Sequence, residues 1–186
     1  FNNIKLKIMK IFFISLASLI ALFTIIYAYF GGFKKISIKI EEQGGETVVY
    51  SSILGDYKQS GVVMDKIYYS LLNDYKIITF KGFGIYYDNP QNVEKSKLRS
   101  DAGCIVEAED IGRLKEISDF QIKELPKKEY IVCEFPYRGK ISVLFSILKV
   151  YPALGKYAKE NGYKEDGAVI EIYDIPSNRI MYRKEI

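Results

Sequence analysis

A four-residue motif, Tyr-Asp-x-Pro, occurs twice in this chain, at residues 87–90 and 173–176, and each copy closes an apolar run. A strand-like run and then a helical stretch precede each copy, with the helical stretches at residues 62–72 and 141–148. The same order of elements therefore recurs at an offset of roughly 80 to 86 residues, which is long enough for a whole supersecondary unit in each copy. This repetition predicts an α+β fold made of two related halves, with a cleft at the pseudo-twofold axis between them.

The apolar segment at residues 11–30 determines what the N-terminal part of the chain can be. It contains no charged residue, and only two serines and one threonine interrupt it. A helix of about 20 residues spans the roughly 30 Å hydrocarbon core of a bilayer. We therefore expect one transmembrane helix at residues 11–30, after a basic flank at residues 1–10 and before a linker at residues 31–35.

A cleaved signal peptide and a buried core helix are the alternatives for this segment. The apolar run of a signal peptide has about 7 to 15 residues and ends in small residues, whereas this run is longer and ends in Tyr29 and Phe30. A core helix is usually apolar on one side only, whereas this run is apolar on every side. A single-pass membrane protein is thus favoured, with its orientation open, because three lysines lie within ten residues on each side of the segment.

Charge and composition exclude several classes of function. Residues 31–186 carry 24 basic and 23 acidic residues, whereas a nucleic-acid-binding domain normally has a basic surface, so we expect no nucleic-acid partner. The absence of histidine excludes Ser-His-Asp and Cys-His catalytic pairs, His-ligated zinc and axial His ligation of haem. Cys104 and Cys133 are expected to be free buried thiols, with a disulfide as the alternative. We predict no catalytic residue, metal site or cofactor.

Periodicity predicts the remaining elements. Isoleucines alternate with polar residues at 36–42, which indicates a half-buried strand, and Gly44-Gly45 predicts a turn into a neighbouring strand at 47–54. Further predicted elements are a strand at 77–88, a short helix at 110–118, and a helix from 141 that breaks or kinks at Pro152 and resumes at 153–161.

Glu171 is the most informative single residue of the second half. Side chains alternate between the two faces of a strand, so Ala168, Ile170 and Ile172 are expected to face the covering helices, while Glu171 lies between apolar neighbours on the other face. Alignment of the two motif copies places Phe83, Ile85 and Tyr87 of the first half on the face that is equivalent to that of Glu171. The predicted ligand-binding residues are Glu171, Tyr173, Val169, Phe83, Ile85 and Tyr87, with Tyr57 and Tyr137 as the lips of the pocket.

Such a pocket, with aromatic walls and one acid, suits a flat, apolar, cationic molecule, because ring faces attract cations and a desolvated carboxylate needs a positive partner. The alternative is a solvated face on which Glu171 points to water.

Several segments, in this order, resemble the GyrI-like domain, the fold of DNA gyrase inhibitor proteins and of the effector-binding domains of bacterial multidrug regulators. They are residues 84–90 (GIYYDNP), 98–103 (LRSDAG), Leu125-Pro126 before Tyr130, and residues 171–173 (EIY). The resemblance implies a GyrI-like, SHS2-type domain at residues 36–186. Its two βαββ repeats, at about 36–108 and 118–186, would form one antiparallel sheet. It also implies a groove for hydrophobic, often cationic molecules, with Glu171 as its polar anchor.

A narrower resemblance is to ER-phagy receptors of the testis-expressed protein 264 type, in which one transmembrane helix precedes a GyrI-like domain. Residues 86–90, 135–137 and 151–157 carry it. It implies a single-pass protein of the ER membrane with a cytosolic domain in a eukaryote, and a cell-membrane location otherwise. The recruiting motif of such receptors lies in a long acidic tail that these 186 residues do not include.

Three functions follow as hypotheses. The first is a membrane-anchored module that binds a small hydrophobic molecule or a peptide in the groove. The second is an adaptor at the ER membrane, in which the fold is a platform for protein partners. The third is hydrolysis of reactive hydrophobic compounds, as in some proteins of similar fold, with Glu171 and Tyr87 or Tyr173 as acid-base groups.

Overall fold

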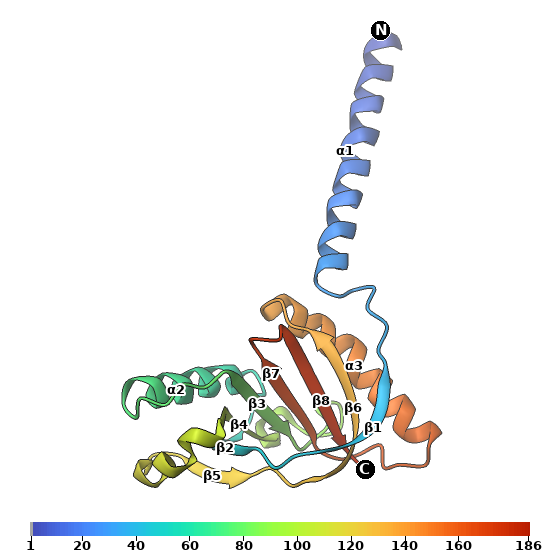
Figure 1. The fold of residues 1–186 in the computed structure, drawn as a ribbon. Coiled ribbons are helices and arrows are strands. Elements are labelled where there is room, and N and C mark those ends of the chain that lie inside the picture. The colour runs from blue at the N-terminus through green and yellow to red at the C-terminus, as the bar shows by residue number, and fades with distance from the viewer. Residues whose placement is uncertain (1) are drawn as a thin grey trace.

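A single long helix, α1 (Asn2–Tyr29), stands apart from the rest of the chain in the computed structural model (Figure 1). The structure describes residues 2–186, so Phe1 of the predicted basic flank lies outside it. Among the described residues α1 is the one helix long and apolar enough to cross a membrane, and its apolar window is not buried against the domain. The predicted flank, from residue 2 on, and the predicted span, up to Tyr29, are therefore parts of one continuous helix.

The domain is one sheet whose strands lie in the order β1-β6-β8-β7-β3-β4-β2-β5, with every neighbouring pair antiparallel. Two long helices and two 3-10 helices complete it. The elements are β1 (Ile38–Gln43), β2 (Thr47–Leu54), α2 (Gln59–Asn73), β3 (Lys81–Tyr86), η1 (Lys95–Lys97), β4 (Arg99–Val106), η2 (Ala108–Glu116), β5 (Gln121–Glu124), β6 (Lys128–Pro136), α3 (Lys140–Glu160), β7 (Val169–Asp174) and β8 (Arg179–Glu185).

The predicted duplication is confirmed by the order of the strands. The series β2-α2-β3-β4 and β6-α3-β7-β8 are equivalent, and they meet where β3 pairs with β7 at the centre of the sheet. The fold is thus the expected α+β tandem, with its pseudo-twofold axis between β3 and β7.

The predicted pairing of the first two strands is wrong. β1 pairs with β6, and β2 pairs with β4 and β5. The first strand of each half, β1 or β5, is therefore paired with a strand of the other half. The two connections run antiparallel where they cross, because Gly45 N–H donates to Leu125 O (2.7 Å) and Leu125 N–H donates to Glu46 O (2.8 Å). Alternating isoleucines identify a strand but not its partner, which is why Gly44-Gly45 was misread as a hairpin turn.

Both long helices cover the same face of the sheet, and it is the face that carries Glu171. α2 packs on Val49, Cys104 and Val106, and α3 packs on Ile131, Phe135 and Tyr182. These strand residues share the face of Glu171, because Glu171 is paired with Tyr182 on one side and with Gly84 on the other.

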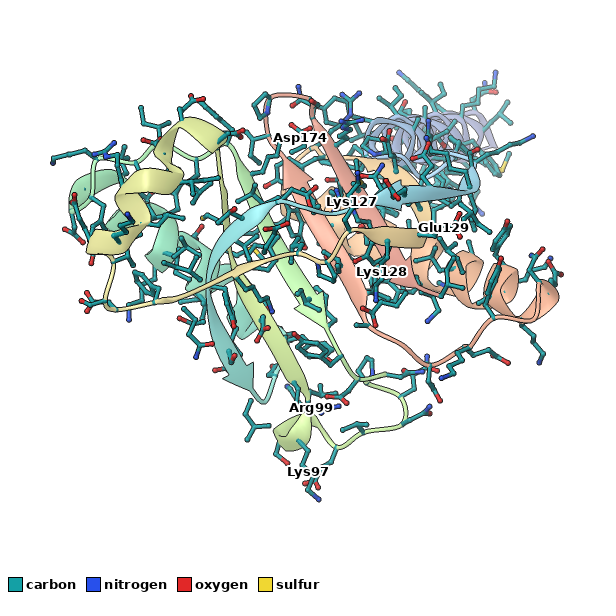
Figure 2. All side chains as sticks on the ribbon, turned by 60° about the horizontal axis from the view of Figure 1, so that its bottom comes forward. Lys97, Arg99, Lys127, Lys128, Glu129 and Asp174 are labelled. Atoms are coloured by element: carbon teal, nitrogen blue, oxygen red, sulfur yellow. The ribbon has the colours of Figure 1, made fainter. Side chains whose placement is uncertain are left out.

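The expectation that Ala168, Ile170 and Ile172 face the helices is therefore wrong. They form a second core with Phe83 on the opposite face, beneath the two crossing connections (Figure 2). Because β7 is buried on both faces, its apolar alternation does not indicate which face the helices cover.

Smaller expectations differ in detail. The strand predicted at 77–88 is limited to β3, the helix predicted at 110–118 is the 3-10 helix η2, and α3 continues through Pro152 without a break. Cys104 and Cys133 are free and buried, as predicted.

The aspartate of each Tyr-Asp-x-Pro motif holds the arginine that starts the next strand. Asp88 accepts hydrogen bonds from the side chain of Arg99 (2.7 Å) and from its backbone N–H (2.7 Å). Asp174 accepts from Arg179 Nε (3.3 Å) and from the backbone N–H of Ser177 (3.1 Å). The repeated motif is thus a structural device that fixes the turn between two strands in each half.

The crossing predicts a difference between two neighbouring glycines. A methyl group on Gly44 would lie 2.1 Å from the backbone oxygen of Pro126, whereas one on Gly45 would meet nothing, although both residues have positive φ. We expect Gly45→Ala to cost about 1 to 2 kcal/mol of folding free energy, from the left-handed backbone alone, and Gly44→Ala to cost more. Denaturant unfolding followed by the near-UV circular dichroism of the tyrosines measures both. Equal losses would contradict the close crossing.

Candidate functional site

A groove of about 1670 Å³ lies between α2 and α3 over the central strands of the sheet. Its floor comes from β3 and β7, which contribute Gly82 and Tyr86 on one side and Val169, Glu171 and Tyr173 on the other. The pseudo-twofold axis therefore runs through the groove, as expected of a duplicated unit.

Glu171 lies at the centre of the floor and is only 2% exposed. Tyr151 on α3 donates its phenol hydrogen to Glu171 Oε1 (2.7 Å), and Tyr173 donates to Oε2. Burial raises the pKa of the Glu171 carboxyl above its ordinary value of 4.5, while the two phenol hydrogen bonds act in the opposite direction. The solvated alternative for Glu171 is therefore wrong.

Aromatic rings surround this carboxyl group. The rings of Tyr57 and Tyr86 meet edge to face with centroids 4.8 Å apart, and those of Tyr137 and Tyr173 do so at 6.0 Å. Burial and the nearby Glu171 charge raise the pKa values of the Tyr86, Tyr151 and Tyr173 phenols. These phenols therefore stay protonated at neutral pH and act as hydrogen-bond donors rather than as bases.

Gly84 leaves the space in which the ring of Tyr86 lies. Gly84 is paired with Glu171 across the centre of the sheet, and a methyl group on it would lie 2.9 Å from the Tyr86 hydroxyl oxygen. A methyl group on Gly82 would come no closer than 3.5 Å to its nearest neighbour, the Met64 sulfur. Any side chain at position 84 would thus displace the ring of Tyr86 from its place over Gly84.

The structure brings six of the eight predicted residues to the groove: Glu171, Tyr173, Val169, Tyr57 and Tyr137, with Tyr87 at its edge. Tyr57 and Tyr137 lie just before α2 and α3 respectively, in agreement with the predicted lips. The hydroxyl of Tyr57 also donates to the backbone oxygen of Asp88 (2.8 Å), so this residue links the motif of the first half to the groove.

The predicted placement of Phe83 and Ile85 beside Glu171 is wrong, because both are buried in the core on the opposite face. Tyr87 reaches the edge of the groove, but its hydroxyl donates to Asp101 (2.7 Å), which is paired with Ile85 on that opposite face. Tyr86, and not Tyr87, shares the face of Tyr173.

A shift of one residue caused this error. Alignment on Tyr-Asp-x-Pro matched Tyr87 with Tyr173, yet by strand face Tyr86 is the counterpart of Tyr173. Tyr87 is thus one extra residue between the strand and Asp88 in the first half. Since side chains alternate along a strand, a slip by one residue moves each of them to the other face.

The groove also contains residues that sequence reasoning missed, namely Tyr86, Tyr151 and Lys184, and Gly84 lies against the ring of Tyr86. Two adjacent tyrosines before Asp88 were the available signal for Tyr86. Nothing in the pattern of α3 indicated that Tyr151 would reach β7. Lys184 is 3% exposed, and burial lowers the pKa of its ammonium group, so the groove holds a buried basic residue as well as a buried acidic one.

Two curated relatives share part of this sequence. The mouse (Mus musculus) testis-expressed protein 264 homolog is 29% identical over 121 residues, which are 61% of this chain and 37% of that protein. The human (Homo sapiens) testis-expressed protein 264 is 26% identical over 144 residues, which are 70% of this chain and 44% of that protein. The chain therefore spans less than half the length of the curated relatives it matches.

Solved structures share the fold at low sequence identity. EcmrR in a cryo-EM complex with DNA has a TM-score of 0.59 at 14% identity, with 97% of this chain and 68% of that chain covered. SAV2435 bound to tetraphenylphosphonium has a TM-score of 0.52 at 10% identity, with 80% and 92% covered. The model of the GyrI-like small molecule binding domain matches residues 37–182, which include the whole groove except Lys184. This chain belongs to the GyrI-like small molecule binding domain family.

Proposed function

We propose that this protein is a membrane-anchored module that binds hydrophobic, cationic molecules or a peptide of that chemistry in the groove between α2 and α3. The observation that carries the proposal is a carboxyl group buried at the centre of an aromatic groove. Among the described residues the hydrogen-bond partners of Glu171 are two phenols, and none of the ion pairs includes it.

The chemistry of the groove selects the charge of the ligand. A buried carboxylate without a cationic partner is costly, and a positive ligand would remove that cost while its apolar surface displaces water from the groove. Tyr57, Tyr86 and Tyr137 line the same space, and the faces of aromatic rings attract cations. Such a site favours a lipophilic cation over a neutral molecule of the same shape.

Tetraphenylphosphonium is a suitable probe of this site. The structure of SAV2435, which has a similar fold, is bound to tetraphenylphosphonium, a cation that carries its charge inside an apolar shell. The match to a small-molecule binding family supports binding over catalysis, so hydrolysis stays a minor alternative.

The membrane part of the proposal rests on the length and apolar character of α1. By analogy with the testis-expressed relatives, we place the protein in the ER membrane of a eukaryotic cell with the domain in the cytosol, and otherwise in the cell membrane. An adaptor that recruits proteins through its outer surface is the alternative, and it requires no ligand in the groove.

The first test measures binding of tetraphenylphosphonium to residues 33–186, because the three apolar cores contain only residues from 36 onward. We expect the cation to raise the melting temperature of the wild type. Glu171→Gln should weaken binding by about 2 kcal/mol or more, because it removes one partner of a buried charge pair. Titration calorimetry gives the affinities.

Glu129→Gln on the exposed part of β6 is the matched control, since Glu129 is not among the groove residues (Figure 2). It should bind like the wild type. A folded wild-type domain that is indifferent to the cation would refute the binding proposal and favour the adaptor.

The second test uses pH. The folded state holds the proton of Glu171 more tightly than the unfolded chain does, because burial raises its pKa above 4.5. Stability of the unliganded domain should therefore contain a component that falls as the pH rises from about 4.5 towards 7. Acidic groups with lowered pKa values, such as Asp88, Asp101 and Asp174, act in the opposite direction at lower pH, near and below 3.8.

Denaturant unfolding of the wild type and of Glu171→Gln across this range isolates the component, which the variant should lack. Affinity for tetraphenylphosphonium should rise with pH over the same range in the wild type and stay level in the variant. Parallel curves for the two proteins would mean that Glu171 does not titrate in the groove.

The third test changes the floor. Gly84→Ala must displace the ring of Tyr86, whereas Gly82→Ala makes only ordinary contacts. We expect Gly84→Ala to weaken tetraphenylphosphonium binding at least about fivefold, the equivalent of roughly 1 kcal/mol, and Gly82→Ala to leave it nearly unchanged. If the two variants bind alike, the position of Tyr86 does not shape the site.

A further inference from the structure

The end of the domain next to α1 carries exposed apolar side chains among basic ones. Ile141 and Leu144, in the first turns of α3, are 50% and 59% exposed, and Ile175, in the turn between β7 and β8, is 50% exposed. Arg138 and Lys140 are exposed beside them. We call these five residues the rim.

The two segments of the rim lie together at one end of the sheet. The backbone N–H of Tyr137 donates to the oxygen of Asn178 (2.8 Å), which joins the turn before α3 to the turn between β7 and β8. Pro136 and Asp174, the last residues of β6 and β7, are both paired with Arg179.

Contacts hold this end of the domain against the base of α1 (Figure 1). The guanidinium carbon of Arg138 lies 4.6 Å from the ring centroid of Tyr29, and the rings of Tyr27 and Phe145 meet at 5.3 Å. Lys149 on α3 donates to the backbone oxygens of Gly32 and Lys34, the latter at 2.7 Å. The predicted linker is thus bound to α3 rather than free.

This arrangement gives the rim one suitable partner. A surface helix with leucine and isoleucine on its outer side and basic residues beside them is typical of segments that lie in the interface of a bilayer. Tyrosines such as Tyr27 and Tyr29 are typical of the ends of membrane spans. Because α3 is tied to the end of α1, a bilayer around α1 would come next to Ile141 and Leu144.

We propose that the rim rests on the surface of an anionic bilayer, with Ile141, Leu144 and Ile175 at the lipid interface and Arg138 and Lys140 near the lipid phosphates. This inference rests on the membrane anchoring in the proposed function. Lys140 and Ile175 also line one end of the groove, so that end opens at the membrane surface.

The test places a nitroxide label at Leu144→Cys in the full chain, reconstituted in phosphatidylcholine vesicles with phosphatidylserine. Cys104 and Cys133 are buried, which protects them from labelling under native conditions. Paramagnetic resonance then compares collisions with oxygen, which concentrates in lipid, and with a water-soluble nickel chelate. Leu54→Cys is the matched control, because Leu54 is an exposed leucine outside the rim. It is the last residue of β2 and is paired with Arg99, which is labelled in Figure 2.

We expect the ratio of oxygen to chelate collisions to be several-fold higher for the label at Leu144 than for the label at Leu54. Replacing Arg138 and Lys140 by glutamine should lower the ratio at Leu144, because the attraction of these two residues to the anionic lipid surface is lost. Vesicles of phosphatidylcholine alone should lower it for the same reason.

A third label, at Leu19→Cys within α1, separates the two possible failures. If Leu19 is in lipid and Leu144 is as exposed to chelate as Leu54, the rim does not touch the bilayer and this inference is overturned while the anchor stands. If Leu19 is itself exposed to chelate, the anchor fails and the inference fails with it. A ratio at Leu144 that is high but equal in neutral and anionic vesicles would refute the role of the two basic residues.

Discussion

The antiparallel pairing of β3 with β7 is the interaction on which the rest of the structure depends. It joins the two halves at the centre of the sheet, and it sets Gly84 directly beside Glu171. Because Gly84 has no side chain, the ring of Tyr86 can lie over β3, and α2 and α3 stay apart over the same two strands. The groove is therefore a consequence of this pairing, and a register shifted by one residue would turn Glu171 into the opposite core.

The exchange of first strands supports this centre from both edges. β1 completes the sheet beside β6, and β5 completes it beside β2, so neither half can form its full share of the sheet alone. The crossing connections also close the face opposite the helices, where Arg183 on β8, 3% exposed, forms a bidentate pair with Glu46. Hydrogen bonds and an ion pair hold both connections over a packed core, and a site preorganised in this way loses less entropy when a ligand binds.

Placing a carboxyl group at this centre is unfavourable unless it has partners. Tyr151 and Tyr173 supply hydrogen bonds but no positive charge, so the site tolerates Glu171 without neutralising it. A structural ion pair such as that of Arg183 with Glu46 is complete by itself, whereas the Glu171 cluster would gain from a cation. This difference separates the groove from the other buried charges of the domain.

The sequence by itself determined most of the elements and their duplication. The spacing of apolar residues and the repeated Tyr-Asp-x-Pro motif were enough to predict two α+β halves, the long apolar N-terminal helix and a buried pair of free cysteines. They also pointed to Glu171, because a lone acid within an apolar strand is unusual, and to Tyr57 and Tyr137, because each lies just before a helix. These are local properties, which neighbouring residues in the chain decide.

Only the tertiary structure decided which strands pair and which face the helices cover. Phe83 and Ile85 were placed one residue out of phase because Tyr87 adds a residue before Asp88, and the register of β3 against β7 alone reveals it. Tyr151 approaches Glu171 from a different element, 20 positions away in the chain, so no pattern within α3 could indicate the contact. Pairing, register and the approach of helix to sheet depend on residues distant in sequence, and the packing of the whole domain selects them.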